Sequence, residues 1–348
     1  MSLIFQKSTE GKHILKTREM LKELPGFIAE YFRGISDSTL AHTRMGYAYD
    51  LRIFFAFLSE EHLNGKEIKS ITTDDMKIIT TEILETFMEY LTYYIRTGEK
   101  DTVIRNESRG KSRKLAAVRG MFKFLRKKNY IENNPAELIS FPKLREKNIT
   151  TLEADEVAKL LDEVDSGDKL SKKQKHFHEI TKLRDSAIIT LLLGTGIRVS
   201  ECVGIDINHI DFNINGIKII RKGGDESVIY FGEEVNVALQ SYLIERSKAT
   251  PEEPHENALF LSIQNKRITT RAVQNLVKKY SALTSSLKNI SPHKLRSTYG
   301  TSLYRETGDI YLVASVLGHA DVNTTKKHYA KLDDEKKRRA ANIVRLRD

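Results

Sequence analysis

Four short segments in the second half of the chain place cations, imidazoles or a phenol beside sharp turns. They are Gly194-Thr195-Gly196-Ile197-Arg198-Val199-Ser200-Glu201, the Lys222-Gly223-Gly224 turn, Ser291-Pro292-His293-Lys294-Leu295-Arg296, and Leu317-Gly318-His319 followed by Tyr329. Each segment alone is common in unrelated proteins. Together they supply two arginines, a lysine, two histidines and a tyrosine, the groups that metal-free transesterification of a phosphodiester requires.

The two arginines carry the electrostatic part of that chemistry. An in-line displacement at phosphorus builds negative charge on the non-bridging oxygens, and guanidinium forks neutralise this charge while staying protonated. Arg198 and Arg296 fit this role. His293 lies three residues before Arg296, so on a helix both side chains share one face. A tyrosine has a pKa of about 10 and needs a base or a cationic field to act as a nucleophile at neutral pH.

This ordered set of motifs resembles the tyrosine recombinase (phage integrase) family, and within it the Xer-like site-specific recombinases. The resemblance extends from about Ser38 to Tyr329. It implies that a phenol attacks the scissile phosphate to give a 3′-phosphotyrosyl link and a free 5′-hydroxyl. A hydroxyl of the partner strand then reverses the reaction, so no metal, ATP or other cofactor is expected.

Carried over by position, the resemblance assigns catalysis to Arg198, Lys222, His293, Arg296, His319 and Tyr329, with Glu201 supporting the first arginine. We expect His293 to act as the base, His319 to donate a hydrogen bond to the phosphoryl oxygens and Lys222 to protonate the leaving oxygen. Arg221 competes with Lys222 for the last role, and Lys222 is preferred because it directly precedes the glycines. Tyr329 follows His319 by ten positions, one more than the spacing most common in the family.

The elements that position these groups are predicted to be mainly α with a small β-sheet (α+β). Two short β-type runs, Gly216–Arg221 and Ser227–Phe231, flank the Lys222 turn. Helices are expected at Ser186–Leu193, from Val199, and around Glu233–Ser247, Thr270–Ser285, Pro292–Arg305 and Tyr311–Leu317.

The first half has the apolar spacing of a small helical domain. One helix is expected to begin near Ser36–Ser38 and to bury Tyr47, Leu51, Phe54, Phe55 and Leu58, and another to cover Thr73–Tyr94. Prolines and polar residues in Asn133–Thr150 indicate a linker. We therefore predict a helical DNA-binding (core-binding) domain with linker over residues 1–145 and a catalytic domain over residues 146–348.

The segment Arg105–Lys128 concentrates positive charge, with ten basic residues against one acid. Leu115, Val118, Phe122 and Leu125 give it one apolar helical stripe. Such a run is either a solvated face or a phosphate-binding surface, and its single sign favours phosphate contact. The residues predicted to bind DNA are Arg105, Arg109, Lys111, Arg113, Lys114, Arg119 and Lys123.

Composition excludes several other classes. The 348 residues carry a formal net charge of +10, which attracts polyanions. A single cysteine, Cys202, excludes an internal disulfide framework and a multi-cysteine zinc site. The absence of a long apolar run or a secretory signal predicts a cytoplasmic protein.

The expected partner is double-stranded DNA with an inverted-repeat core site, and the resemblance implies a homo-tetramer on that DNA. It also implies that the tail Asp333–Asp348 docks in a neighbouring protomer through Ile343 and Val344, the alternative being packing within its own chain. Two rivals stay open: a type IB topoisomerase-like enzyme and a catalytically silent DNA-binding protein. The target site, the choice among dimer resolution, integration, excision and inversion, and the need for an accessory protein also stay open.

Overall fold

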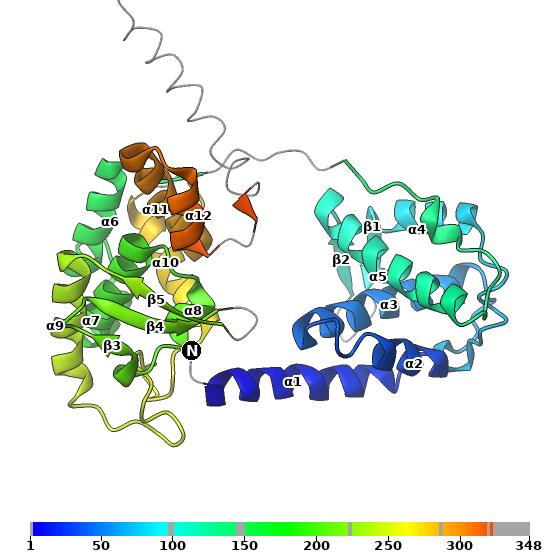
Figure 1. Ribbon diagram of the computed structural model, residues 1–348, viewed down its shortest axis with the longest axis horizontal. Helices are drawn as coiled ribbons and strands as arrows, with labels where there is room; N and C mark the ends of the chain where they lie inside the picture. Colours follow the sequence, from blue (N-terminus) through cyan, green and yellow to red (C-terminus); the bar gives the residue numbers. More distant parts are fainter. Residues whose placement is uncertain are drawn as a thin grey trace, which may run out of the picture. The chain divides into compact units, whose positions relative to one another are not determined.

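The computed structural model describes residues 3–96, 101–143, 150–221, 225–284, 288–318 and 321–322 (Figure 1). The chain divides into two compact units, a first of residues 7–147 and a second of residues 148–348, with which residues 1–6 are grouped. The described residues form helices with two small antiparallel sheets, which confirms the predicted mainly α fold with a small β-sheet. No described helix combines the length and the apolar character needed to cross a membrane.

The first unit packs its helices around one aromatic-rich core. The helices are α1 (Leu3–Leu21), α2 (Gly26–Gly34), α3 (Ala41–Glu61), α4 (Thr81–Tyr90) and α5 (Ser108–Lys127), with 3₁₀ turns η1 (Ile68–Ser70) and η2 (Pro135–Glu137). α3 packs against α5, and the ring of Phe54 contacts those of Phe87 on α4 and Phe122 on α5. The predicted stripe Leu115, Val118, Phe122 and Leu125 is fully buried, so one face of α5 belongs to this core.

Two predictions for the first unit are wrong in their bounds. The helix expected from Ser36–Ser38 begins at Ala41, and Tyr47 is only partly buried although Leu51, Phe54, Phe55 and Leu58 are buried. The helix expected over Thr73–Tyr94 is confined to Thr81–Tyr90, where Thr80 caps it by accepting a hydrogen bond from the Ile83 amide. The chain then forms strand β1 (Tyr93–Arg96), which pairs antiparallel with β2 (Thr102–Arg105).

The second unit is built around helix α7 (Lys172–Thr195), which contacts α6, α9 and α11. Its other helices are α6 (Ala154–Ser166), α8 (Val199–Val203), α9 (Glu233–Arg246), α10 (Thr270–Thr284), α11 (Pro292–Thr307) and α12 (Ile310–Leu317), with the 3₁₀ turn η3 (Ile207–His209). Strands β3 (Ile210–Asp211), β4 (Gly216–Ile220) and β5 (Glu226–Tyr230) form an antiparallel sheet in that order. The predicted strand pair and the helices after it are confirmed within a few residues. Figure 1 shows α9 beside α7 and α12 next to α11, and both pairs of helices are in contact.

Candidate active site

Four of the predicted active-site residues lie in the described part of the second unit: Arg198, Glu201, His293 and Arg296. Lys222, His319 and Tyr329 lie outside the described residues, as does the tail Asp333–Asp348. The geometry below is therefore that of the two arginines, their supports and the helix ends around them.

Arg198 stands at the turn between α7 and α8. Helix α7 ends at Thr195 and is capped by Gly196, which adopts a left-handed conformation with φ of 62°. A Cβ at this position would come within 2.5 Å of the Tyr299 ring, so both the backbone angle and the packing require glycine. This tight turn makes Arg198 the residue immediately before α8.

Glu201 holds Arg198 through two contacts. The side chain of Arg198 donates from Nη1 to Oε1 of Glu201 at 2.8 Å, and its backbone amide donates to Oε2 at 2.9 Å. Glu201 has only 4% of its side chain exposed, whereas Arg198 keeps 36%. The buried carboxylate fixes the guanidinium of Arg198, which still reaches the surface.

Arg296 is buried on α11 and connects two helix ends. Its Nη1 donates to the Gly196 carbonyl at the end of α7, at 2.6 Å, and its Nη2 donates to the Leu317 carbonyl at the end of α12. α11 is itself tied to the start of the second unit, because the Thr298 hydroxyl accepts a hydrogen bond from the Leu152 amide at 3.0 Å. The position of Arg296 is thus set by three separate segments of the unit.

The last turn of α12 brings the arginines together. Arg198 donates from Nη2 to the Gly318 carbonyl at 3.0 Å, next to the Leu317 carbonyl that Arg296 contacts. A third guanidinium, that of Arg221 at the end of β4, donates from Nη2 to the Val316 carbonyl at 3.2 Å. Carbonyls at a helix C-terminus carry the negative end of the helix dipole, which suits cationic donors. Three segments of the chain therefore deliver positive charge to one helix end, directly before His319 in the sequence.

His293 lies one helical turn before Arg296, as its spacing predicts. Pro292 occupies the first position of α11, and Leu295 is fully buried, which orients the first turn. His293 is exposed, whereas Arg296 is 6% exposed. The imidazole is therefore open to solvent or to a ligand at the same end of α11 as the guanidinium.

Cys202 is fully buried in the core beside this site, and burial raises the pKa of its thiol to about 12. A thiol with that pKa is protonated at neutral pH and is a poor nucleophile. No cluster of three or more histidine, cysteine or acidic side chains that could hold a metal ion occurs among the residues that the structure describes.

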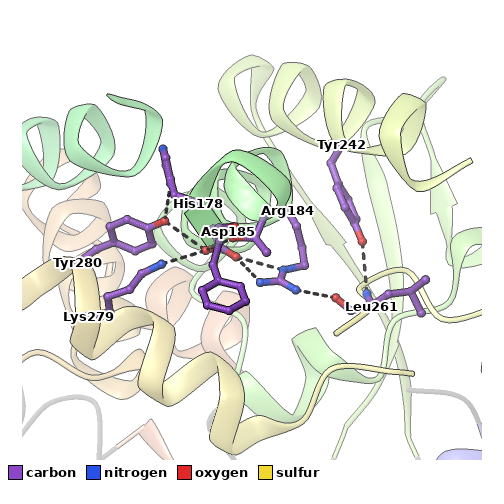
Figure 2. A network of polar contacts seen from close by, with 9 residues as sticks. His178, Arg184, Asp185, Tyr242, Leu261, Lys279 and Tyr280 are labelled. Atoms are coloured by element: carbon purple, nitrogen blue, oxygen red, sulfur yellow. Dashed lines mark hydrogen bonds and ion pairs between the residues drawn. The ribbon is translucent and has the colours of Figure 1, made fainter. Parts of the chain in front are cut away.

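A polar network that the sequence did not reveal joins α7 to α10 (Figure 2). Asp185, 1% exposed, accepts hydrogen bonds from Arg184 at 2.7 Å, Lys279 at 3.3 Å and the Tyr280 hydroxyl at 3.2 Å. His178 contacts the same hydroxyl at 3.0 Å. Burial, followed by the nearby Asp185 charge, raises the pKa of Tyr280 far above its usual value. This phenol stays protonated, and the network joins two helices of the core.

The basic segment of the first unit is less uniform than its sequence. Lys114 is buried and donates to Asn106 Oδ1 at 2.8 Å. Arg113 pairs with the buried carboxylate of Asp50. Lys111 donates to the Thr92 hydroxyl at 2.5 Å.

Arg119 contacts the segment that follows α5. Its guanidinium donates to the carbonyls of Ala136, Glu137 and Ile139 and lies 4.4 Å from the ring centre of Phe141. The start of the predicted linker thus packs on the first unit, and Ala136 and Ile139 are buried in its core.

Three of the seven predicted DNA-binding side chains are exposed without a described ion pair: Arg105, Arg109 and Lys123. Arg105 lies on strand β2 and not on the predicted helix, and its guanidinium is 5.5 Å from the Tyr93 ring centre. Arg109 and Lys123 lie on α5.

Comparison with known proteins places this geometry in a family. A family model described as the phage integrase family matches residues 150–336. The tyrosine recombinase XerC of Caldanaerobacter subterraneus subsp. tengcongensis is 34% identical over 86% of this chain and 81% of its own length. Its counterpart in Leptospira interrogans serovar copenhageni is 29% identical over 88% of both chains.

Solved structures share the fold. The XerH site-specific recombinase in a post-cleavage complex with a palindromic difH substrate superposes with a TM-score of 0.62 at 21% identity. The match covers 83% of this chain and 75% of that one.

Proposed function

The chain belongs to the phage integrase family and is a tyrosine recombinase, an enzyme that cuts and rejoins DNA, and on this premise we propose which of its side chains carry the reaction. The observation that carries the assignment is the meeting of Arg198 and Arg296 at the adjacent carbonyls of Gly318 and Leu317. These guanidiniums are the groups that neutralise the non-bridging oxygens of the scissile phosphate.

In the proposed step, the Tyr329 hydroxyl attacks phosphorus and passes its proton to His293. The bond from phosphorus to the 5′-oxygen breaks, and Lys222 gives that oxygen a proton, leaving a 3′-phosphotyrosyl link and a free 5′-hydroxyl. His319 donates a hydrogen bond to a phosphoryl oxygen. Rejoining is the same sequence in reverse with the hydroxyl of a partner strand, so the energy of the phosphodiester bond is kept without metal or ATP.

Glu201 is assigned a supporting role. Its two contacts with Arg198 hold the guanidinium in one orientation before DNA arrives. A guanidinium that is already oriented loses less conformational entropy when it binds phosphate.

The first unit is assigned to DNA binding, through residues 1–145. Its exposed cations Arg105, Arg109 and Lys123 are the first candidates for phosphate contact. Lys111, Arg113, Lys114 and Arg119 already have partners within the unit and contribute mainly to the positive field.

The proposed substrate is duplex DNA with an inverted-repeat core site, bound by four copies of the chain. Symmetric sites suit symmetric assemblies of one protein. The tail Asp333–Asp348 would join neighbouring copies through Ile343 and Val344. We propose that the enzyme acts in the cytoplasm. Comparing recombination by the purified protein with and without cell extract would show whether an accessory protein is needed.

Covalent capture tests the proposal. The protein is incubated with a pool of nicked duplexes that includes the DNA flanking its own gene, denatured in detergent, and the attached DNA is sequenced. We expect one inverted-repeat site with the wild type, none with Tyr329→Phe, and the same site with Tyr311→Phe, an exposed tyrosine of α12 that serves as the matched control.

Two results contradict the proposal. Attachment without sequence preference, together with relaxation of supercoils, identifies a topoisomerase-like activity. Adducts that persist in Tyr329→Phe exclude that residue as the nucleophile.

A further inference from the structure

Arg221 occupies a position that no catalytic assignment above uses. It follows the last residue of β4 and directly precedes Lys222 in the sequence. Its backbone amide donates to the Asp225 carbonyl at 2.8 Å, which extends the pairing of β4 and β5 beyond Ile220 and Glu226 toward the connection between the two strands. The side chain leaves this hairpin and reaches the end of α12, where Nη2 contacts the Val316 carbonyl at 3.2 Å.

The side chain of Arg221 lies so close to the end of α12 that residue 318 must be glycine. Gly318 has a left-handed conformation with φ of 59°, and a Cβ at this position would overlap the Arg221 guanidinium. Arg221 therefore lies against the bare backbone of Gly318, the residue directly before His319. Its Nε atom is buried and makes no hydrogen bond within the described residues.

Arg221 thus joins two segments that are 95 positions apart. One segment leads directly into Lys222 and the other into His319. The described ion pair of this hairpin joins Lys218 to Glu226 at 2.8 Å. It connects β4 to β5 and does not connect the hairpin to another element.

We propose that Arg221 is a positioning residue that fastens the β4–β5 hairpin to the end of α12, so that the lysine following it is held where it can protonate the leaving oxygen. The proposal rests on the proposed function, in which Lys222 is the general acid. A general acid loses its effect when it is misplaced by about 1 Å, at a cost of roughly 10²-fold in rate. Arg221 acts on the reaction through Lys222 and not by contact with the phosphate.

The test compares two DNA substrates. One has the ordinary 5′-oxygen at the scissile position, and the other has sulfur there. A thiol has a pKa of about 8.5, far below that of an alcohol, so a departing thiolate needs no proton from the enzyme. Covalent adduct formation is timed for the wild type, Arg221→Met, Lys222→Ala and the matched control Lys218→Met, which removes a cation from the same strand.

On the oxygen substrate we expect Arg221→Met to form adduct roughly 10²-fold more slowly than wild type, with unchanged affinity for DNA. On the sulfur substrate the deficit should shrink to a few-fold, in parallel with Lys222→Ala. Lys218→Met should match the wild type on both substrates. Arg221→Lys, which keeps the charge but loses the fork, should fall between wild type and Arg221→Met on the oxygen substrate.

Two outcomes overturn the inference. If Lys222→Ala recovers on sulfur and Arg221→Met does not, then Arg221 acts on the phosphate or on folding. If Arg221→Met cleaves the oxygen substrate as fast as wild type, the contact with α12 has no part in the reaction.

Failure of the proposed function gives a different pattern. If Lys222→Ala does not recover on sulfur, the acid assignment fails, and the inference fails with it. If the wild type forms no adduct through Tyr329 on either substrate, the assignment of the nucleophile fails.

Discussion

The cations of α5 are neighbours in the sequence and have separate partners in space, whereas the arginines of the second unit are far apart in the sequence and meet at one helix end. On α5, Arg113 pairs with Asp50, and Lys114 turns to Asn106. At α12, Arg198, Arg221 and Arg296 contact three consecutive carbonyls.

The difference lies in what neutralises the charge. Neutral carbonyls and a helix dipole equivalent to about half a charge offset three guanidiniums only in part. Glu201 supplies a full negative charge to Arg198. The end of α12 is therefore a place where an added phosphate gains energy from Arg198 and Arg296 at once, whereas the eight basic residues of α5 offer a phosphate less than their number suggests.

The largest expected effect is that of removing Arg296. Arg296→Ala should slow adduct formation by about 10³-fold, because one preorganised donor to the developing charge is lost. Arg296→Lys should recover little, since an ammonium cannot replace both contacts of the fork. The rate is measured by the covalent adduct, with DNA affinity measured separately.

Arg305→Ala is the matched control for Arg296→Ala. Arg305 lies on the same helix, and its exposed pair with Glu153 is worth at most about 1 kcal/mol. Its variant should keep the wild-type rate. An Arg296→Ala variant that cleaves within ten-fold of wild type would contradict the assignment.

The sequence reveals the convergence at α12 only in part. The order of motifs predicts Arg198 and Arg296 as site residues, and helical spacing adds Glu201, three residues after Arg198, and His293, three residues before Arg296. Arg221 has no such signal, because its partner, the Val316 carbonyl, comes near it only in the folded unit. Local spacing cannot predict a contact between residues 95 positions apart.

The same limit explains the error over Thr73–Tyr94. The four-residue spacing of Ile79, Ile83, Phe87 and Leu91 continues a helical period past both ends of α4. At its start Thr80 caps the helix, and after Leu91 the aromatic and β-branched residues pair with Thr102–Arg105. Strand β1 forms because it pairs with β2, which lies outside the segment that shows the helical spacing.

The second expected effect is a pH dependence of stability that arises from Asp50. The buried carboxylate of Asp50 has one ion-pair partner, Arg113, whereas that of Asp185 accepts hydrogen bonds from several side chains. Burial raises the pKa of Asp50 to about 6, although Arg113 opposes the shift. Because the folded pKa lies above the unfolded one, stability from this group is full below about pH 4 and is lost as the pH rises through about 6. The shift corresponds to about 3 kcal/mol.

Hydrogen exchange of α3 and α5 amides in the full chain should therefore show less protection at pH 7 than at pH 4.5. Asp50→Asn should reduce this difference, since an amide does not titrate in that range. Equal pH dependence in both proteins would show that Asp50 is not the group responsible.

The smallest expected effect separates the two kinds of cation on α5. Lys123 is exposed, so Lys123→Ala should weaken DNA binding a few-fold and reduce the slope of log affinity against log salt by about 0.9. Arg119→Met also removes one positive charge, but this guanidinium donates hydrogen bonds to carbonyls that follow α5. The variant should therefore lower the free energy of unfolding by roughly 1–3 kcal/mol and leave the salt dependence of DNA affinity nearly unchanged. Affinity measured from low to moderate salt, beside denaturant unfolding, distinguishes them. Equal changes in slope would mean that the internal contacts of Arg119 do not keep its charge from DNA, and that α5 binds through its whole basic run.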